Sequence, residues 1–162
     1  MENSPGDHNL QRQLDDALAD SFPASDPVSI VTSQTEEYWN MKGYVTDIER
    51  DTLANADYRR VLFTGRNTQL VLMTVQPGDE IGLETHEEHD QFIRIEAGTG
   101  TVVLGGVKHE LRDGSAVVIP AGVEHNVINT SHDEPLRLYT LYSPPEHPDG
   151  TVHKTKADDH GH

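Results

Sequence analysis

A series of short, β-rich runs constrains the fold of this chain more than any other feature of its sequence. From Tyr58 onward, stretches of aliphatic, threonine and aromatic residues alternate with turns that contain glycine, proline, asparagine or aspartate. Short strands at even spacing, with turn signals between them, are typical of an antiparallel sandwich or a closed barrel. We therefore predict an all-β domain with strands at 60–64, 68–75, 80–86, 91–96, 101–104, 107–111, 116–119, 125–130 and 136–142.

The residues before this domain are polar and acidic, with little periodicity. Leu10, Leu14 and Leu18 recur at helical spacing, which predicts a short amphipathic helix at about Asn9–Ser21. A short helix with one aliphatic stripe is unstable alone in water, so it docks on the domain, binds a partner or stays mobile. We divide the chain into a partly mobile N-terminal arm, a connecting or edge segment, the β-barrel and a polar C-terminal tail, at 1–28, 29–57, 58–145 and 146–162.

The composition excludes several classes of partner. The formal net charge is -16, so the chain lacks the excess of lysine and arginine that nucleic acid or an anionic membrane requires. Its longest apolar runs, Leu70–Met73 and Ala116–Ile119, are far shorter than a membrane span, and its first residues do not resemble a signal peptide. We therefore expect a cytoplasmic protein that binds neither nucleic acid nor membrane. Because the chain has no cysteine, any metal must be held by nitrogen and oxygen atoms.

Potential metal ligands lie within these β-rich runs. Glu84 and His86 are separated by one residue, so on a strand both side chains point to the same face. Two such side chains next to each other cost desolvation energy unless a positive charge lies between them. Together with Gln91 and His125, they predict a divalent metal site inside a β-sheet structure.

These residues occur in two segments that resemble the sequence motifs of the cupin superfamily. The matching residues are Gly78, Glu84, His86, Gln91 and Gly98 in the first motif and Gly114, Pro120, Gly122, His125 and Asn129 in the second. The second segment matches in residue type and spacing, whereas the first departs at two ligand positions. The resemblance covers about residues 58–145 and is to small single-domain bacterial cupins, often named mannose-6-phosphate-isomerase-like. It implies a small RmlC-like jelly-roll β-barrel.

The departure in the first motif changes the implied ligand set. Most cupins use three histidines and one glutamate, whereas the resemblance here implies Glu84, His86, Gln91 and His125. The ligand charge is unchanged, because each set contains one carboxylate. Such ligands suit Fe(II), Mn(II), Zn(II), Ni(II) or Co(II), and the order of affinities does not choose among them. Without Gln91, which then bonds a metal-bound water, the set is the face of two histidines and one carboxylate that oxygen-activating iron sites use.

His89 is a further candidate, for a catalytic role. We expect it on a turn at the mouth of the barrel, where it is either a solvated surface residue or an acid or base near the open coordination positions. Nearer the C-terminus, His147 and His153 either cap the cavity or belong to a solvated tail, and for His153 the tail is favoured.

Three functions remain open from the sequence. The leading hypothesis is a metalloenzyme that acts on a small oxygenated organic substrate, with dioxygenase-like or sugar-isomerase-like chemistry. The alternatives are a non-catalytic module that binds a small molecule, and an interaction or scaffold protein that works through the N-terminal helix. The resemblance to cupins also implies a homodimer, to whose interface we expect residues 29–45 to contribute.

Overall fold

The computed structural model describes residues 42–159 of the chain. The helix predicted at Asn9–Ser21, the rest of the arm and most of the proposed dimer segment lie outside the described residues. Within 42–159, no helix combines the length and the apolar character needed to cross a membrane. The elements are α3 (Ile48–Ala54), β1 (Arg59–Thr64), β2 (Gln69–Val75), β3 (Asp90–Ala97), β4 (Gly100–Leu104), β5 (Val107–Leu111), β6 (Ala116–Ile119), β7 (His125–Asn129), β8 (Leu136–Ser143), β9 (Val152–His153) and the 3-10 helix η1 (Lys156–Asp158).

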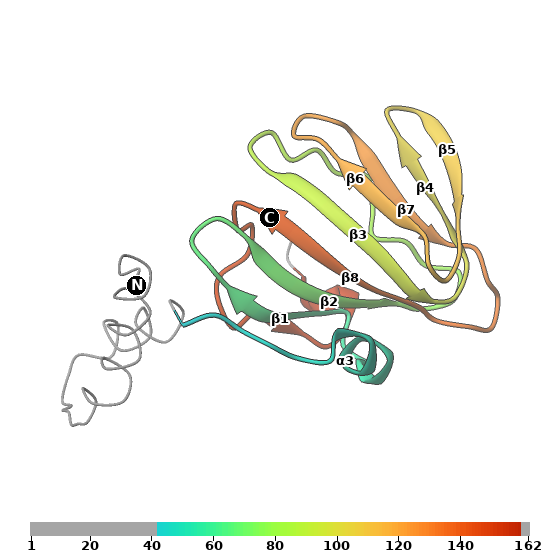
Figure 1. Cartoon of the computed structure of the whole chain (residues 1–162). Coiled ribbons are helices and arrows are strands. Elements are labelled where there is room, and N and C mark those ends of the chain that lie inside the picture. The colour runs from blue at the N-terminus through green and yellow to red at the C-terminus, as the bar shows by residue number, and fades with distance from the viewer. Residues whose placement is uncertain (1–41, 160–162) are drawn as a thin grey trace, which may run out of the picture. The chain divides into compact units, whose positions relative to one another are not determined.

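The strands form two sheets that face each other (Figure 1). The larger sheet has six strands in the order β6-β3-β8-β2-β1-β9, and the smaller has three in the order β5-β4-β7. All of the strand pairs are antiparallel. The all-β jelly-roll fold predicted from the sequence is therefore confirmed.

Inward-facing side chains of both sheets form the core. In β3, Gln91, Ile93 and Ile95 are buried, as alternate residues on one face of a strand are. The alternation ends where the register between β3 and β8 shifts after Ile95, and Glu96 is buried there as well. The core residues of the two sheets include Val71, Met73, Leu138, Val102 and Val127.

The prediction of a strand at 80–86 is wrong. This segment makes only isolated bridges to β7, at Glu80 and Glu84. Gly82 has a φ of 115°, which interrupts the extended conformation. Its N–H donates to the side-chain oxygen of Asn126 at 2.8 Å instead of to a backbone carbonyl of a partner strand. The segment therefore runs beside β7 as an irregular chain.

A short helix occupies the segment that we expected only to connect the arm to the barrel. The side chain of Asp47 caps α3 by accepting a hydrogen bond from the N–H of Arg50 at 3.1 Å. Arg137 of β8 donates to the carbonyl oxygens of Leu53 and Asn55 at 2.8 and 2.6 Å. These bonds hold the end of α3 against the outer face of the larger sheet.

The segment predicted as a polar tail packs on the barrel up to residue 159. β9 pairs with β1, and Lys156 Nζ donates to the carbonyl oxygen of Glu80 at 2.6 Å. The backbone N–H of Tyr58 donates to the carbonyl oxygen of Lys154 at 3.2 Å. These contacts add a strand to the larger sheet and bring the C-terminal residues next to the irregular segment.

At Gly100 the backbones of β4 and β7 approach closely, and a substitution at this glycine tests that packing. A Cβ atom there would collide with the carbonyl oxygen of Ile128, which cannot move without disturbing the β4–β7 pairing. We expect Gly100→Ala to lower the free energy of unfolding by about 2 kcal/mol, measured by urea denaturation. The control is Gly65→Ala, whose Cβ would meet its nearest atom at an ordinary 3.4 Å. An equal loss in both variants would contradict the close approach.

Candidate metal centre

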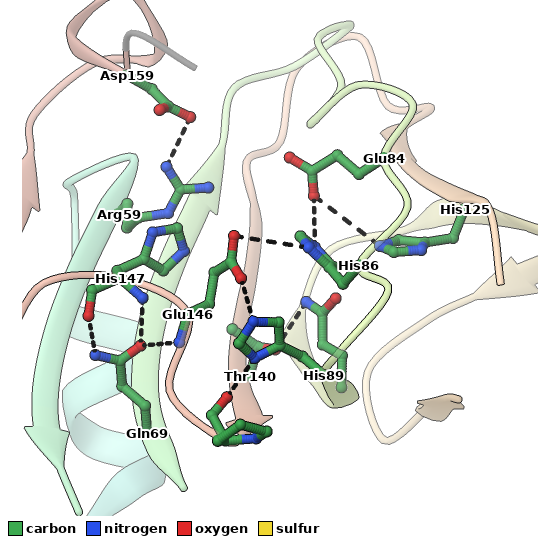
Figure 2. Close-up of polar contacts among 12 residues, drawn as sticks. Arg59, Gln69, Glu84, His86, His89, His125, Thr140, Glu146, His147 and Asp159 are labelled. Carbon is green, nitrogen blue, oxygen red and sulfur yellow. Dashed lines mark hydrogen bonds and ion pairs between the residues drawn. The ribbon is translucent and has the colours of Figure 1, made fainter. Parts of the chain in front are cut away.

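Glu84 and His125 are joined through their backbones. The N–H of Glu84 donates to the carbonyl oxygen of His125 at 2.8 Å, and the reverse bond measures 2.9 Å. This antiparallel bridge attaches the irregular segment to the first residue of β7. Figure 2 shows that both side chains are directed toward His86. The bridge therefore places two potential ligands at a fixed spacing.

Glu84, His86 and His125 form a compact cluster. One potential ligand atom from each residue lies within 4.8 Å of the other two. Oε1 of Glu84 is 3.2 Å from Nε2 of His86 and 4.0 Å from Nε2 of His125, and the two imidazole centroids are 5.3 Å apart. The hydrogen bond to Glu84 raises the pKa of His86 above its ordinary value. The structure thus brings together three of the four residues predicted as ligands.

His125 has one ring nitrogen available for a ligand. Its Nδ1 lies 2.9 Å from the carbonyl oxygen of Val123. Because a carbonyl only accepts, Nδ1 carries a proton, and in the neutral imidazole Nε2 then carries the lone pair. This Nε2 is buried and has no hydrogen-bond partner among the described residues. Such an unsatisfied atom costs free energy in the folded protein, and it is the donor that a divalent metal takes from histidine.

Gln91, the fourth predicted ligand, lies on the inner face of β3. Its Nε2 donates to Oγ1 of Thr140 at 3.0 Å, whereas its Oε1 is buried without a partner in residues 42–159. Gln91 pairs in register with Tyr142, whose ring centroid is 5.8 Å from that of His86. Two imidazole nitrogens, a carboxylate oxygen and a buried amide oxygen with a free lone pair are a donor set that fits a divalent transition metal.

Glu146 belongs to the same site, although the sequence analysis did not select it. One carboxylate oxygen lies 3.7 Å from Nδ1 of His86, and the other lies 2.9 Å from Nε2 of His89. Nδ1 of His89 lies 2.7 Å from the carbonyl oxygen of Pro144. His89 is therefore held at the site by both ring nitrogens. Its suggested role as acid or base stays a prediction.

The sequence carries only a weak signal for Glu146. It follows the last long strand, β8, in a part of the chain that reads as a polar tail. Glu146 and His147 lie between prolines just after that strand. Because proline stiffens the backbone, a proline-flanked pair of polar residues at a strand end is the signal that could have selected them. His147 is in fact buried, with its ring 5.1 Å from that of Tyr142.

A cavity of about 450 Å³ lies against this cluster. It opens to solvent between the irregular segment and the segment that follows β8. A volume of this size suits a small organic molecule. Its lining residues are Leu83, Glu84, Thr85, His86, Glu87, Glu88, His89 and Glu146.

Arg59 contributes a buried cation to the other side of the site (Figure 2). Its guanidinium donates to Oδ2 of Asp159 at 2.7 Å and lies 3.4 Å from Nδ1 of His153, which is therefore part of the packed structure rather than a solvated tail. Burial raises the pKa of Tyr58 to about 12 and raises that of Tyr142 as well, so both phenols are neutral at physiological pH. They add hydroxyl groups to the barrel interior without adding charge.

Comparison with known proteins identifies the family. Residues 71–142 match the profile of the family described as Cupin domain. The chain is 50% identical over 123 residues to the uncharacterized protein YrkC of Bacillus subtilis, a match that covers 72% of this chain and 66% of YrkC. An uncharacterized protein of Acanthamoeba polyphaga mimivirus is 46% identical over 112 residues, which covers 67% of this chain and 70% of that protein. The crystal structure of BH2720 from Bacillus halodurans aligns with a TM-score of 0.69 and 47% identity, covering 71% of this chain and 91% of that chain.

The ion pair between Arg59 and Asp159 generates a test of stability. The Arg59 side chain is 1% exposed and that of Asp159 is 13% exposed. Asp159→Ala leaves the buried cation without a carboxylate, so we expect the free energy of unfolding to fall by roughly 3 kcal/mol. Urea denaturation measures the loss, with Asp149→Ala as the control because Asp149 is exposed. Similar small losses in both variants would contradict this role of Asp159.

Proposed function

Because this chain belongs to the cupin superfamily and three of its side chains converge on one point, we propose that it binds a divalent metal ion. Glu84, His86 and His125 are the proposed ligands, with Gln91 as the fourth. The observation that carries this proposal is the buried Nε2 of His125, which faces Glu84 at 4.0 Å and has no hydrogen-bond partner in the described part of the chain. Fe(II), Mn(II), Zn(II), Ni(II) and Co(II) all suit such ligands.

The same site supports a metalloenzyme that acts on a small oxygenated organic molecule, by dioxygenase-like or isomerase-like chemistry. A bound metal supplies Lewis-acid polarisation of a substrate oxygen or, as Fe(II), activation of oxygen. The chain itself supplies a cavity for the substrate and a His125 ring whose orientation is fixed. It also supplies the hydrogen-bonded pair of His89 and Glu146, the candidate acid or base at the cavity wall.

A non-catalytic module that binds a small molecule is the second candidate. Glu84 and His86 already share a hydrogen bond of 3.2 Å, so this part of the cluster is satisfied without a metal. That observation favours a site that binds a small molecule without a metal and without converting it. A role through the N-terminal helix concerns residues outside 42–159 and has no structural argument behind it.

The homodimer is likewise a proposal. Of residues 29–45, only 42–45 are described, and among these Tyr44 is 43% exposed and Val45 is 97% exposed. An apolar side chain as exposed as Val45 is consistent with a surface that a second copy covers.

Removal of one ligand tests the metal site. We expect His125→Ala to weaken binding of Zn(II) or Mn(II) by more than about 100-fold, since even residues that only orient a ligand change metal affinity by about 10- to 100-fold. The measurement is isothermal titration of metal-stripped protein, followed by elemental analysis. His109→Ala, an exposed histidine on β5, is the control and should bind metal as the wild type does. Unchanged binding in His125→Ala would refute the proposed centre.

Turnover separates the enzyme from the binding module. A thermal-shift screen of small metabolites should find a compound that stabilises the metal-loaded wild type and leaves His125→Ala unaffected. That compound is then incubated with Fe(II)-loaded and Zn(II)-loaded protein. Oxygen uptake with Fe(II) alone supports a dioxygenase, and conversion with both metals supports an isomerase. Stabilisation without conversion under any metal contradicts the enzyme and leaves the binding module.

A further inference from the structure

One side of β6 has no partner strand in the described part of the chain. β6 is the last strand of the larger sheet and pairs with β3 alone (Figure 1). Apart from that pairing, no backbone group of β6 makes a hydrogen bond within residues 42–159. An open strand edge can add a further strand, because its N–H and C=O groups are already aligned for pairing.

The register shows which backbone groups of β6 face the open side. The N–H of Ile95 in β3 donates to the carbonyl oxygen of Ser115 at 2.9 Å, so the carbonyl of Ser115 points to β3. Backbone groups alternate in direction along an antiparallel strand, so those of Val117 also point to β3. The N–H and C=O groups of Ala116 and Val118 therefore point to the open side.

The exposed side chains of β6 are apolar as well. Val118 is 66% exposed and Ala116 is exposed, whereas Val117 and Ile119 belong to the buried side of the strand. Val118 lies in register with Phe92 of β3 on the outer face of the larger sheet. The open edge thus combines unpaired backbone groups with apolar side chains that solvent reaches.

The other open edges of the two sheets carry charges, and that of β6 does not. β5, the last strand of the smaller sheet, contains Lys108 and Glu110. β9, at the far edge of the larger sheet, has only two residues and is followed by Lys154. Short length and charged side chains are the means by which proteins keep strand edges from pairing. Residues 114–123, which include β6, contain no charged side chain.

The charge of the chain and the symmetry of the strand favour a second copy as the partner. With a formal net charge of -16, two copies repel each other over most of their surfaces, and they approach at the least cost along the uncharged segment 114–123. A twofold axis at Val117 sets Ala116 of each copy opposite Val118 of the other. These are the residues whose N–H and C=O groups face the open side, so an identical strand satisfies them.

We propose that β6 pairs antiparallel with β6 of a second copy, so that the larger sheets of the two copies become one continuous sheet. The inference rests on the homodimer of the proposed function and assigns its contact to β6 instead of residues 29–45. In the pair, Val118 of each copy packs on Ala116 of the other. Since a strand of four residues gives a small interface, we expect a reversible dimer with a dissociation constant in the micromolar range.

Hydrogen exchange reads this pairing at individual amides. NMR follows the exchange of metal-stripped, full-length protein as its concentration rises, and sedimentation follows its mass. The N–H groups of Ala116 and Val118 should exchange at least about threefold more slowly in the dimer than in the monomer. The N–H of Val117 is directed at β3, so it should exchange slowly at every concentration and serves as the internal control.

A charge placed at the open edge should separate the copies. Val118→Lys brings a cation into the apolar contact of both copies, so we expect the dissociation constant to rise at least about tenfold. Ala116→Lys, at the other exposed position of β6, serves if the first variant does not fold. The matched control is Val107→Lys on β5, where the valine is 57% exposed, and it should dimerise as the wild type does. Val45→Lys should also leave the constant unchanged.

Four results would overturn the inference. A dimer in which Ala116 and Val118 exchange as fast as in the monomer, or one that Val45→Lys dissociates more than Val118→Lys does, refutes the β6 contact and leaves the homodimer. Slow exchange of these two amides in a monomer means that another part of the chain covers the edge. A monomer at every concentration refutes the contact and the homodimer together. All of these measurements use metal-stripped protein, so the proposed metal centre stands or falls separately.

Discussion

The backbone bridge between Glu84 and His125 is the contact on which the candidate metal centre depends. Its two hydrogen bonds, 2.8 and 2.9 Å long, attach an irregular segment to the first residue of β7. Gly82 keeps that segment from becoming a strand, so the bridge and not a continuous ladder sets the position of the carboxylate. A shift of one residue at the bridge would turn Glu84 to the other face and separate it from both imidazoles.

The C-terminal segment completes the site from the opposite side. Gln69, buried in β2, accepts from the N–H groups of Glu146 and His147 at 3.1 and 2.9 Å and donates to the carbonyl oxygen of His147 at 2.7 Å. Lys156 then joins this segment to the irregular one through the carbonyl oxygen of Glu80. The regular sheets thus provide a rigid frame, and two irregular segments tied to that frame carry most of the chemical groups.

Charge is balanced locally inside this acidic protein. The buried Arg59 is paired with Asp159, and Glu146 is paired with His89. Each pair offsets the desolvation cost of its charges. A lone buried ion would bear that cost in full. The buried atoms left without partners in the described barrel include Nε2 of His125 and Oε1 of Gln91. A buried polar atom without a partner calls for a physical explanation, and the proposed metal ion supplies one for both of these atoms.

The sequence by itself determined the all-β class, because alternation and turn residues are local properties of the chain, and the jelly roll followed from the resemblance of its two motifs to those of cupins. The sequence also singled out Glu84, His86 and His125, whose side chains the structure brings together, although the reason given for Glu84 and His86, a shared strand face, was wrong. Tertiary structure decided the rest. Gly82 converts a strand-like run into an irregular one, α3 forms where no pattern predicts it, and Glu146 reaches His86 only because buried Gln69 holds its backbone. These outcomes depend on contacts between residues far apart in the chain, which no local pattern encodes.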